Sequence, residues 1–299
     1  MKKWLITGIS VILVLFIIFI GISAYLGYSM TRLKRLPLER SPDILGLAYE
    51  DVSFQSMDGD PTLRGWFLPN PDSEQVIVMV HGNESNRDDP TIGTLDIAFK
   101  LVEHGYSVLM FDLRGCGESG GEMVSAGYYE KRDLEGAVEY VKERGFERIG
   151  VLGFSLGAVT SLLATAESGD IDAVVSDSSF ADLTDIMGPE FSKRTRAPAV
   201  FLRPMLFVVK IMYGVDFGAI KPVECVSGIK AVPIFFIHGD EDDTIPVEHA
   251  RRLKQASQHT RDRLWIVPET GHTRAYINYP EEYIGRVTAF FDEALKQKN

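Results

Sequence analysis

Three features are scarce or missing in this sequence of 299 residues. Cysteine occurs only at Cys116 and Cys225, without CxxC or Cys/His ligand spacing, so neither a disulfide framework nor a zinc site is indicated. Positive charge is in deficit, because 31 Lys and Arg face 42 Asp and Glu, and the resulting net charge of −11 repels nucleic acid. No internal repeat or low-complexity segment is visible. Nucleic-acid-binding, disulfide-rich and zinc-stabilised classes are therefore disfavoured.

One long apolar run stands at the N-terminus. Residues 5–26 contain no charge, and at about 1.5 Å per residue a helix of this length crosses roughly the 30 Å of a bilayer core. The run is longer than the apolar region of about 7 to 15 residues in a cleavable signal peptide, and Ser-Ala-Tyr is a poor cleavage site. We therefore expect residues 1–28 to be an uncleaved, single-pass anchor in the cell membrane. Basic residues flank the run on both sides, so the side that holds the rest of the chain stays open, with a lean toward the extracytoplasmic side.

The rest of the chain divides into a short linker and one domain. Residues 29–49 are predicted to be the linker, because Pro37, Pro42 and basic residues interrupt any periodicity. Residues 50–299, about 250 in all, fit a single α/β catalytic domain. Its hydrophobic share of 45% and charged share of 24% are ordinary for a globular protein. Strands at 50–57 and 62–68 are predicted to form a hairpin at its start.

Beyond the hairpin, apolar runs alternate with longer segments of helical period. This rhythm is typical of a mostly parallel, doubly wound sheet with helices on both faces, whose sites form at the carboxyl ends of the strands. The six runs are residues 76–80, 107–111, 149–152, 173–176, 233–237 and 264–267. About fifty residues separate the fourth run from the fifth, far more than a common loop. We therefore expect a small helical cap insertion at about 181–230.

The segment GFSLG contains the strongest candidate nucleophile, Ser155. It lies between an apolar strand and a helical segment, the context that a nucleophile elbow requires. The turn is so tight that side chains at Gly153 and Gly157 would collide, so glycine is needed at both positions. The hydroxyl would then stand clear of the sheet at a helix N-terminus. Taken alone the motif fixes only three positions, and a serine that merely caps the helix is the alternative.

A second element of acyl-transfer chemistry follows the run at 76–80. Gly82 lets the backbone turn, so that the N–H of Asn83, together with that of Leu156, is expected to bind a developing oxyanion. His81 precedes this turn, and His238 stands in a similar His-Gly pair. Both histidines are expected to bond to the backbone rather than act as bases.

His272 is the candidate general base. It follows the last predicted strand and precedes the C-terminal helix, so it is placed over the same sheet edge as Ser155. His104 precedes a strand, and His249 and His259 lie in or beside a polar helical region, so these three are less suitable. A plain loop histidine is the alternative for His272, but the order Ser, Asp, His favours the catalytic interpretation.

The sequence leaves open which acidic residue orients the base. Asp240, Glu241, Asp242 and Asp243 all follow the run at 233–237, and composition does not choose among them. Asp177, at the end of the preceding strand, is a further candidate. A solvated charged loop is the alternative, and a metal site is poorly supported because calcium loops need ligands at regular spacing around a glycine.

Together the segments VHGN, FDLRGCGESGG, GFSLG, HGDEDDTIP and ETGH resemble the serine hydrolases of the α/β-hydrolase superfamily, from about residue 50 to the end. The likeness is greatest to bacterial single-pass membrane-anchored hydrolases and to membrane-associated serine hydrolases of eukaryotes. In that family the spacing of HGxxDxxxP selects Asp242 as the acid and leaves Asp243 beside it. The resemblance also implies a structural role for Asp112 and Arg114. Asn83 departs from the family, where many members carry a small or apolar residue.

The resemblance implies hydrolysis of an ester, thioester or amide through an acyl-enzyme, and the residues support the same chemistry. Ser155 would attack the carbonyl, His272 would carry the proton and Asp242 would hold the imidazolium, with no metal or organic cofactor. The expected substrate is a carboxylic ester, either a small molecule or a lipid with an apolar acyl group. A peptidase or amidase is the main alternative. A catalytically silent binding protein is less favoured, because no triad member is missing, and the oligomeric state stays open.

Overall fold

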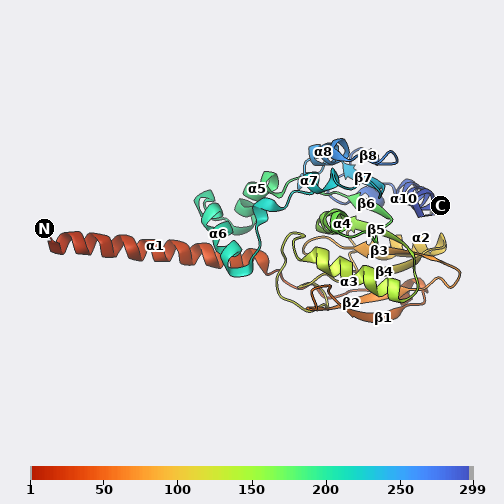
Figure 1. Ribbon diagram of the computed structural model, residues 1–299, viewed down its shortest axis with the longest axis horizontal. Coiled ribbons are helices and arrows are strands. Elements are labelled where there is room, and N and C mark those ends of the chain that lie inside the picture. The colour runs from red at the N-terminus through yellow and green to blue at the C-terminus, as the bar shows by residue number, and fades with distance from the viewer. Residues whose placement is uncertain (1, 296–299) are drawn as a thin grey trace.

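The computed structural model describes residues 2–295, and an eight-stranded sheet lies at its centre (Figure 1). The strand order is β1-β2-β4-β3-β5-β6-β7-β8; β2 runs antiparallel to both of its neighbours, and the other neighbours are parallel. The strands are β1 (Glu50–Gln55), β2 (Thr62–Leu68), β3 (Gln75–Val80), β4 (Ser107–Phe111), β5 (Arg148–Phe154), β6 (Ala173–Asp177), β7 (Ile234–Gly239) and β8 (Arg263–Val267). Every predicted strand end lies within two residues of the observed one, and the mostly parallel, doubly wound sheet is confirmed.

Helices cover both faces of the sheet, because successive side chains of a strand point to opposite sides. In β3, Val76, Val78 and Val80 pack against one helical layer, and Ile77 and Met79 pack against the other. The first layer contains α3 (Glu130–Glu143), α4 (Leu156–Glu167), α7 (Pro222–Val226) and α8 (Glu248–Ala256). The second contains α2 (Thr94–Glu103), α9 (Ala275–Asn278) and α10 (Pro280–Leu295). Burial on both sides explains why the strands read as continuous apolar runs.

A helical insertion separates β6 from β7. It contains α5 (Leu183–Thr195), the 3-10 turn η2 (Ala199–Phe201) and α6 (Leu202–Tyr213), followed by η3 (Phe217–Ala219) and α7. Figure 1 shows α6 across the C-terminal half of α1, with α5 between α6 and the strands. We call α5, η2 and α6 the cap.

The N-terminal helix α1 (Lys2–Thr31) projects from the body as a long rod (Figure 1). By length and composition it is able to cross a membrane. Its buried residues gather near its C-terminal end, where it packs against α6. A Cβ atom on Gly27 would lie 2.5 Å from Cγ2 of Val209, so a larger residue would push the two helices apart. Nearer the N-terminus of α1, the ring centroids of Phe19 and Phe201 are 4.7 Å apart.

Residues 32–49, most of the predicted linker, lie against the domain. Arg40 donates to the buried Asp88 carboxylate (Nη2 to Oδ1, 2.7 Å), and Arg35 donates to the carbonyl oxygen of Cys116 (3.2 Å). Four apolar side chains of this segment also pack against the second helical layer: Leu38, Leu45, Leu47 and Tyr49. The segment therefore joins α1 to β1 along the protein surface rather than as a free tether.

Candidate active site

Ser155 stands at the sharp turn from β5 into α4. Its φ of 51° and ψ of −112° lie where residues other than glycine are rarely found, so the backbone is strained at this residue. Its N–H donates to the carbonyl oxygen of Asp177 (2.8 Å). A Cβ on Gly153 would lie 2.4 Å from the Gly157 oxygen, and a Cβ on Gly157 would lie 2.1 Å from the Val80 oxygen. The turn therefore requires both glycines, as the sequence predicted.

The imidazole of His272 lies between Ser155 and Asp242. Its Nε2 is 2.9 Å from the Ser155 hydroxyl oxygen, and its Nδ1 is 2.7 Å from Oδ2 of Asp242. The three side chains follow β5, β7 and β8, whose carboxyl ends lie at the same edge of the sheet. With Nδ1–H donating to the carboxylate, Nε2 is left to accept the hydroxyl proton.

The Asp242 carboxylate is buried and held by several donors. Its Oδ1 accepts from the backbone N–H groups of Thr244 (2.9 Å) and Ile245 (2.8 Å), and its Oδ2 lies 3.2 Å from Nε2 of His238. Burial alone would raise the pKa of Asp242, but the hydrogen bonds from His238 and His272 outweigh it and hold that pKa below its usual range. The carboxylate therefore stays ionised and holds the His272 ring through its Nδ1.

Neither alternative acid is hydrogen-bonded to His272. Asp243 is exposed, whereas Asp177 is buried and accepts from the hydroxyls of Ser178 (2.9 Å) and Tyr283 (3.1 Å). Burial raises the pKa of Asp177 to about 6. Ser178 also accepts a hydrogen bond from the N–H of the residue after the histidine (3.1 Å). Asp177 thus braces the loop that carries His272 and does not contact its ring.

The two expected oxyanion donors also border the serine. Asn83 follows β3, Leu156 begins α4, and both line the same cavity as Ser155. Within residues 2–295, neither backbone N–H donates to another protein group, so both are available to a ligand. His81 fixes this turn, because its Nδ1 lies 2.7 Å from the Gly82 oxygen and its Nε2 accepts a backbone N–H from the neighbouring loop (3.0 Å). Burial lowers its pKa, which keeps it neutral.

Asp112 and Arg114 take the structural role that the resemblance implied. Asp112 forms a buried ion pair with Arg87 (2.5 Å), and Arg114 pairs with the buried Asp133 (2.7 Å). These pairs lie away from His272 and brace the loop after β4. Within the described residues, no group of His, Cys, Asp and Glu side chains is arranged to hold a metal ion.

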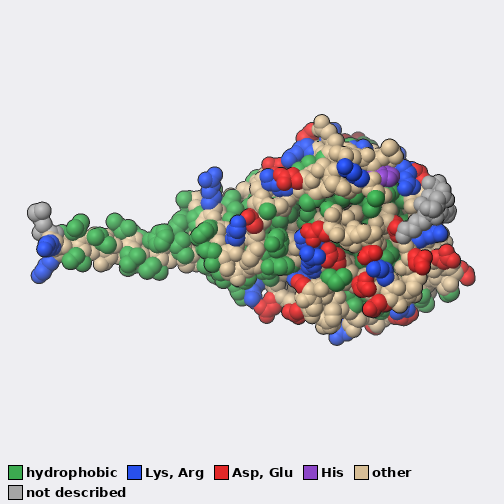
Figure 2. All heavy atoms as spheres, in the orientation of Figure 1, with side chains coloured by type: hydrophobic (Ala, Val, Ile, Leu, Met, Phe, Trp, Pro, Cys, Tyr) green, Lys and Arg blue, Asp and Glu red, His purple; other side chains and the backbone are tan. Residues whose placement is uncertain are grey.

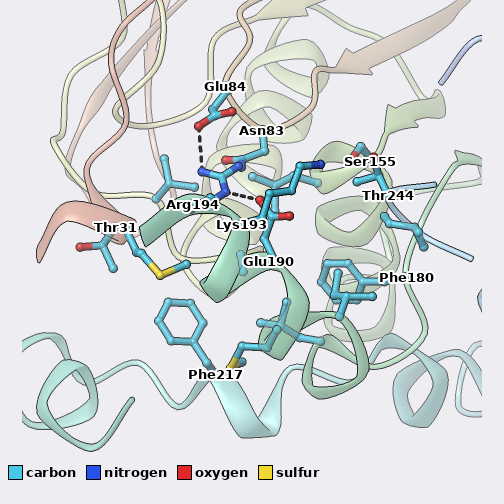
Figure 3. A pocket seen from close by; sticks show the side chains of 18 of the residues that line it. Thr31, Asn83, Glu84, Ser155, Phe180, Glu190, Lys193, Arg194, Phe217 and Thr244 are labelled. Atoms are coloured by element: carbon cyan, nitrogen blue, oxygen red, sulfur yellow. Dashed lines mark hydrogen bonds and ion pairs between the residues drawn. The ribbon is translucent and has the colours of Figure 1, made fainter. Parts of the chain in front are cut away.

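A cavity of about 470 Å³ lies above Ser155 (Figure 3). Its wall is mostly apolar, and the larger apolar side chains are Phe180, Leu183, Ile186, Met187, Met205, Leu206, Val209 and Phe217. At one side Arg194 lies between Glu84 and Glu190 and pairs with both. The end of α1 also contributes Gly27, Met30 and Thr31 to the wall. Sequence reasoning missed these three residues, because an evenly apolar helix does not reveal which face packs.

Comparison with known proteins identifies the family. The family model described as alpha/beta hydrolase fold matches residues 75–207. The uncharacterized protein YqkD of Bacillus subtilis is 30% identical over 235 residues, which cover 77% of this chain and 75% of that protein. The chain belongs to the α/β-hydrolase superfamily. Among solved structures this hydrolase is similar to the esterase Pf2001 of Pyrococcus furiosus, with a TM-score of 0.75, 27% identity and coverage of 89% of this chain and 98% of that one.

More distant similarities agree with this assignment. The α/β-hydrolase domain-containing protein WAV2 of Arabidopsis thaliana is 23% identical, over 86% of this chain and 83% of that protein. The acylaminoacyl peptidase of Pyrococcus horikoshii gives a TM-score of 0.62 at 20% identity, over 86% of this chain and 44% of that one. At this identity the likeness to the peptidase concerns the fold alone. Family and structural relatives together make the chain a hydrolase.

Proposed function

We propose that this hydrolase cleaves carboxylic esters through an acyl-enzyme formed on Ser155. The observation that carries the proposal is the position of His272, which is 2.9 Å from the serine hydroxyl and 2.7 Å from the Asp242 carboxylate. A base that is oriented by a buried acid and bonded to a partly exposed hydroxyl is the arrangement that activates serine for attack on a carbonyl.

The reaction follows from this geometry. Oγ of Ser155 bonds to the carbonyl carbon while Nε2 of His272 takes the hydroxyl proton. The carbonyl oxygen becomes an oxyanion that accepts hydrogen bonds from the N–H groups of Asn83 and Leu156. The bond to the alcohol then breaks, and Nε2 returns the proton to the leaving oxygen. Water attacks the acyl-enzyme with His272 again as base, which releases the acid and restores Ser155.

The cavity supports an apolar acyl group as the substrate part bound next to the serine. Its wall is built from α1, α5 and α6, and it holds about 470 Å³. A volume of this size suits a small-molecule ligand or one acyl chain, and apolar side chains favour hydrocarbon over polar groups. Together with a helix able to cross a membrane, this wall supports lipid or other apolar acyl esters as substrates of a single-pass membrane enzyme.

Hydrolysis of p-nitrophenyl esters of graded acyl length tests the proposal, with Ser155→Ala as the inactive variant. We expect turnover that rises from acetyl to longer chains and is lost on Ser155→Ala. A matched p-nitroanilide separates an esterase from an amidase, because the same triad cleaves both bonds. Activity that persists in Ser155→Ala would overturn the proposal. Faster cleavage of the anilide would show that the preferred substrate is an amide and not an ester.

A further inference from the structure

The outer face of the cap is strongly apolar and exposed. Val200, Phe207, Ile211 and Met212 expose 64%, 63%, 69% and 52% of their surfaces, and we call these four side chains the apolar cap face. Phe207 and Ile211 are four residues apart and so lie on one side of α6. Figure 2 shows hydrophobic side chains that continue from α1 onto the adjoining end of the body. A soluble protein rarely exposes such a group without a binding partner.

The opposite side of α6 fixes the cap beside α1. Met205 and Val209 are buried there with Leu26 of α1. The approach of Gly27 to Val209 leaves no room for a side chain, and Phe19 is in ring contact with Phe201 just before α6. The cap is therefore packed along the C-terminal half of α1, and the position of α1 in a membrane sets the position of the cap.

The contact between Phe19 and Phe201 sets the depth. A helix that enters the bilayer core at residue 5 has crossed its 30 Å near residue 25, at about 1.5 Å per residue. Phe19 lies six residues before that point, which places it about 9 Å inside the core. Its partner Phe201 then lies below the headgroups as well, and Val200 is its neighbour in sequence.

Two cationic side chains lie close in sequence to the apolar cap face. Arg196 and Arg203 are exposed, and within residues 2–295 neither forms an ion pair. Arginine beside an apolar surface extends its guanidinium toward anionic headgroups while its stem stays among hydrocarbon. Charge and apolar surface thus match the same partner, a lipid bilayer.

We propose that the apolar cap face is embedded in the bilayer that α1 crosses. The cap is then a second membrane contact, and its inner side chains Met205, Leu206 and Val209 form the wall of the cavity that ends at Ser155. Only one layer of helix separates lipid from this cavity. That a lipid ester uses this proximity rests on the proposed function, whereas the membrane contact itself does not.

Fluorescent labels at single cysteines test the contact in the full chain. The background is Cys225→Ser, because Cys225 is half-buried while Cys116 is buried. An environment-sensitive dye is attached at Val200→Cys on the cap, next to Phe201, at Val14→Cys on α1, or at Glu74→Cys at the amino end of β3. The protein is reconstituted in vesicles of equimolar phosphatidylcholine and phosphatidylglycerol, and quenching by nitroxide-labelled lipid is compared with quenching by aqueous iodide.

We expect the labels at positions 200 and 14 to be quenched by the lipid nitroxide and shielded from iodide, and the label at position 74 to show the reverse. If the label at 14 reports lipid while that at 200 is as accessible to iodide as that at 74, α1 is inserted and the embedded cap is refuted. Iodide access at all three positions would refute both the insertion of α1 and the embedding of the cap. The labels report position without turnover, so a failure of the proposed esterase function leaves this result unaffected.

Discussion

The two ends of the cavity are held by different forces. At the sheet edge, His272 and Asp242 are fixed by short hydrogen bonds, and the carboxylate also accepts two backbone N–H groups. At the other end, α1 and α6 meet through apolar side chains around Leu26 and Val209. Hydrogen bonds are directional and fix atoms to a few tenths of an ångström, whereas apolar burial is non-directional. Under the proposed function, the first end carries out the reaction and the second selects the substrate that reaches it.

We call the end of the cavity at Ser155, His272 and Asp242 the polar end, and the end at α1 and α6 the apolar end. Removal of the proposed nucleophile should have the largest effect on activity. We expect Ser155→Ala to lower kcat by about 10⁶-fold, as loss of the nucleophile does in a serine protease. A fluorophosphonate probe should no longer label the protein. Ser192→Ala, at an exposed position of α5, is the matched control and should keep both activity and labelling. Equal labelling of the Ser155→Ala variant would assign the nucleophile elsewhere.

Loss of the orienting charge should have the next largest effect. Asp242→Asn removes the acceptor that holds Nδ1–H of His272, and we expect kcat to fall by about 10⁴-fold. Asp243→Asn, one residue along and exposed, should stay close to the unaltered enzyme. Steady-state rates on one p-nitrophenyl ester measure both. Near-normal turnover in Asp242→Asn, with loss in Asp243→Asn or Asp177→Asn, would show that the acid is misassigned.

The two buried carboxylates of the polar end should respond to pH with opposite signs. Burial raises the pKa of Asp177 from 3.8 to about 6, so its stabilising contribution is complete at low pH and is lost as pH rises through about 6. Asp242, whose pKa is lowered, contributes stability that is lost only as pH falls. Relative to the unaltered protein, Asp177→Asn should therefore gain unfolding free energy between about pH 4 and 7, on the order of 2 to 3 kcal/mol.

Urea unfolding in a mild detergent, at a series of pH values, measures this difference. The comparison with Asp177→Asn cancels the slope from other buried groups such as Asp133, whose pKa burial also raises to about 6. A difference that stays constant from pH 4 to 7 would contradict the prediction.

The apolar end should show a smaller effect that spares the chemistry. Gly27→Leu pushes α1 away from Val209, so we expect KM for a long-chain ester to rise about tenfold while kcat for an acetyl ester changes little. Gly8→Leu is the matched control on the same helix, because a side chain there meets nothing within 4 Å. Equal effects of the two substitutions would show that the contact with α6 does not shape the cavity.

The sequence predicted the polar end more fully than the apolar end. Ser155 and its two glycines form one local turn, and the edge of a parallel sheet brings strand-end residues such as His272 together whatever the loops do. The choice of Asp242 as the candidate acid needed the spacing of the family motif, because Asp243 has the same side chain. Only the hydrogen bonds of the folded loop distinguish the two.

The features that sequence analysis missed depend on which face of a segment packs against the rest of the protein. Gly8 and Gly27 lie in the same apolar run, and only the folded cap distinguishes them. Residues 29–49 read as a linker because prolines and basic residues break their periodicity, yet Arg35 and Arg40 find partners far along the chain. Such partners leave no periodic signal, since single long-range contacts repeat at no fixed spacing.

The contact between Gly27 and Val209 joins two elements that are made at well separated times during synthesis. Val209 follows Gly27 by about 180 residues, which a ribosome adds in about 10 to 40 s at 5 to 20 residues per second. During that interval α1 exists without the helix that covers Gly27, and β1 to β6 are completed before α6 appears. The cap and the cavity wall that α1 shares with it are therefore assembled only after the first six strands are made, on a helix that has already emerged.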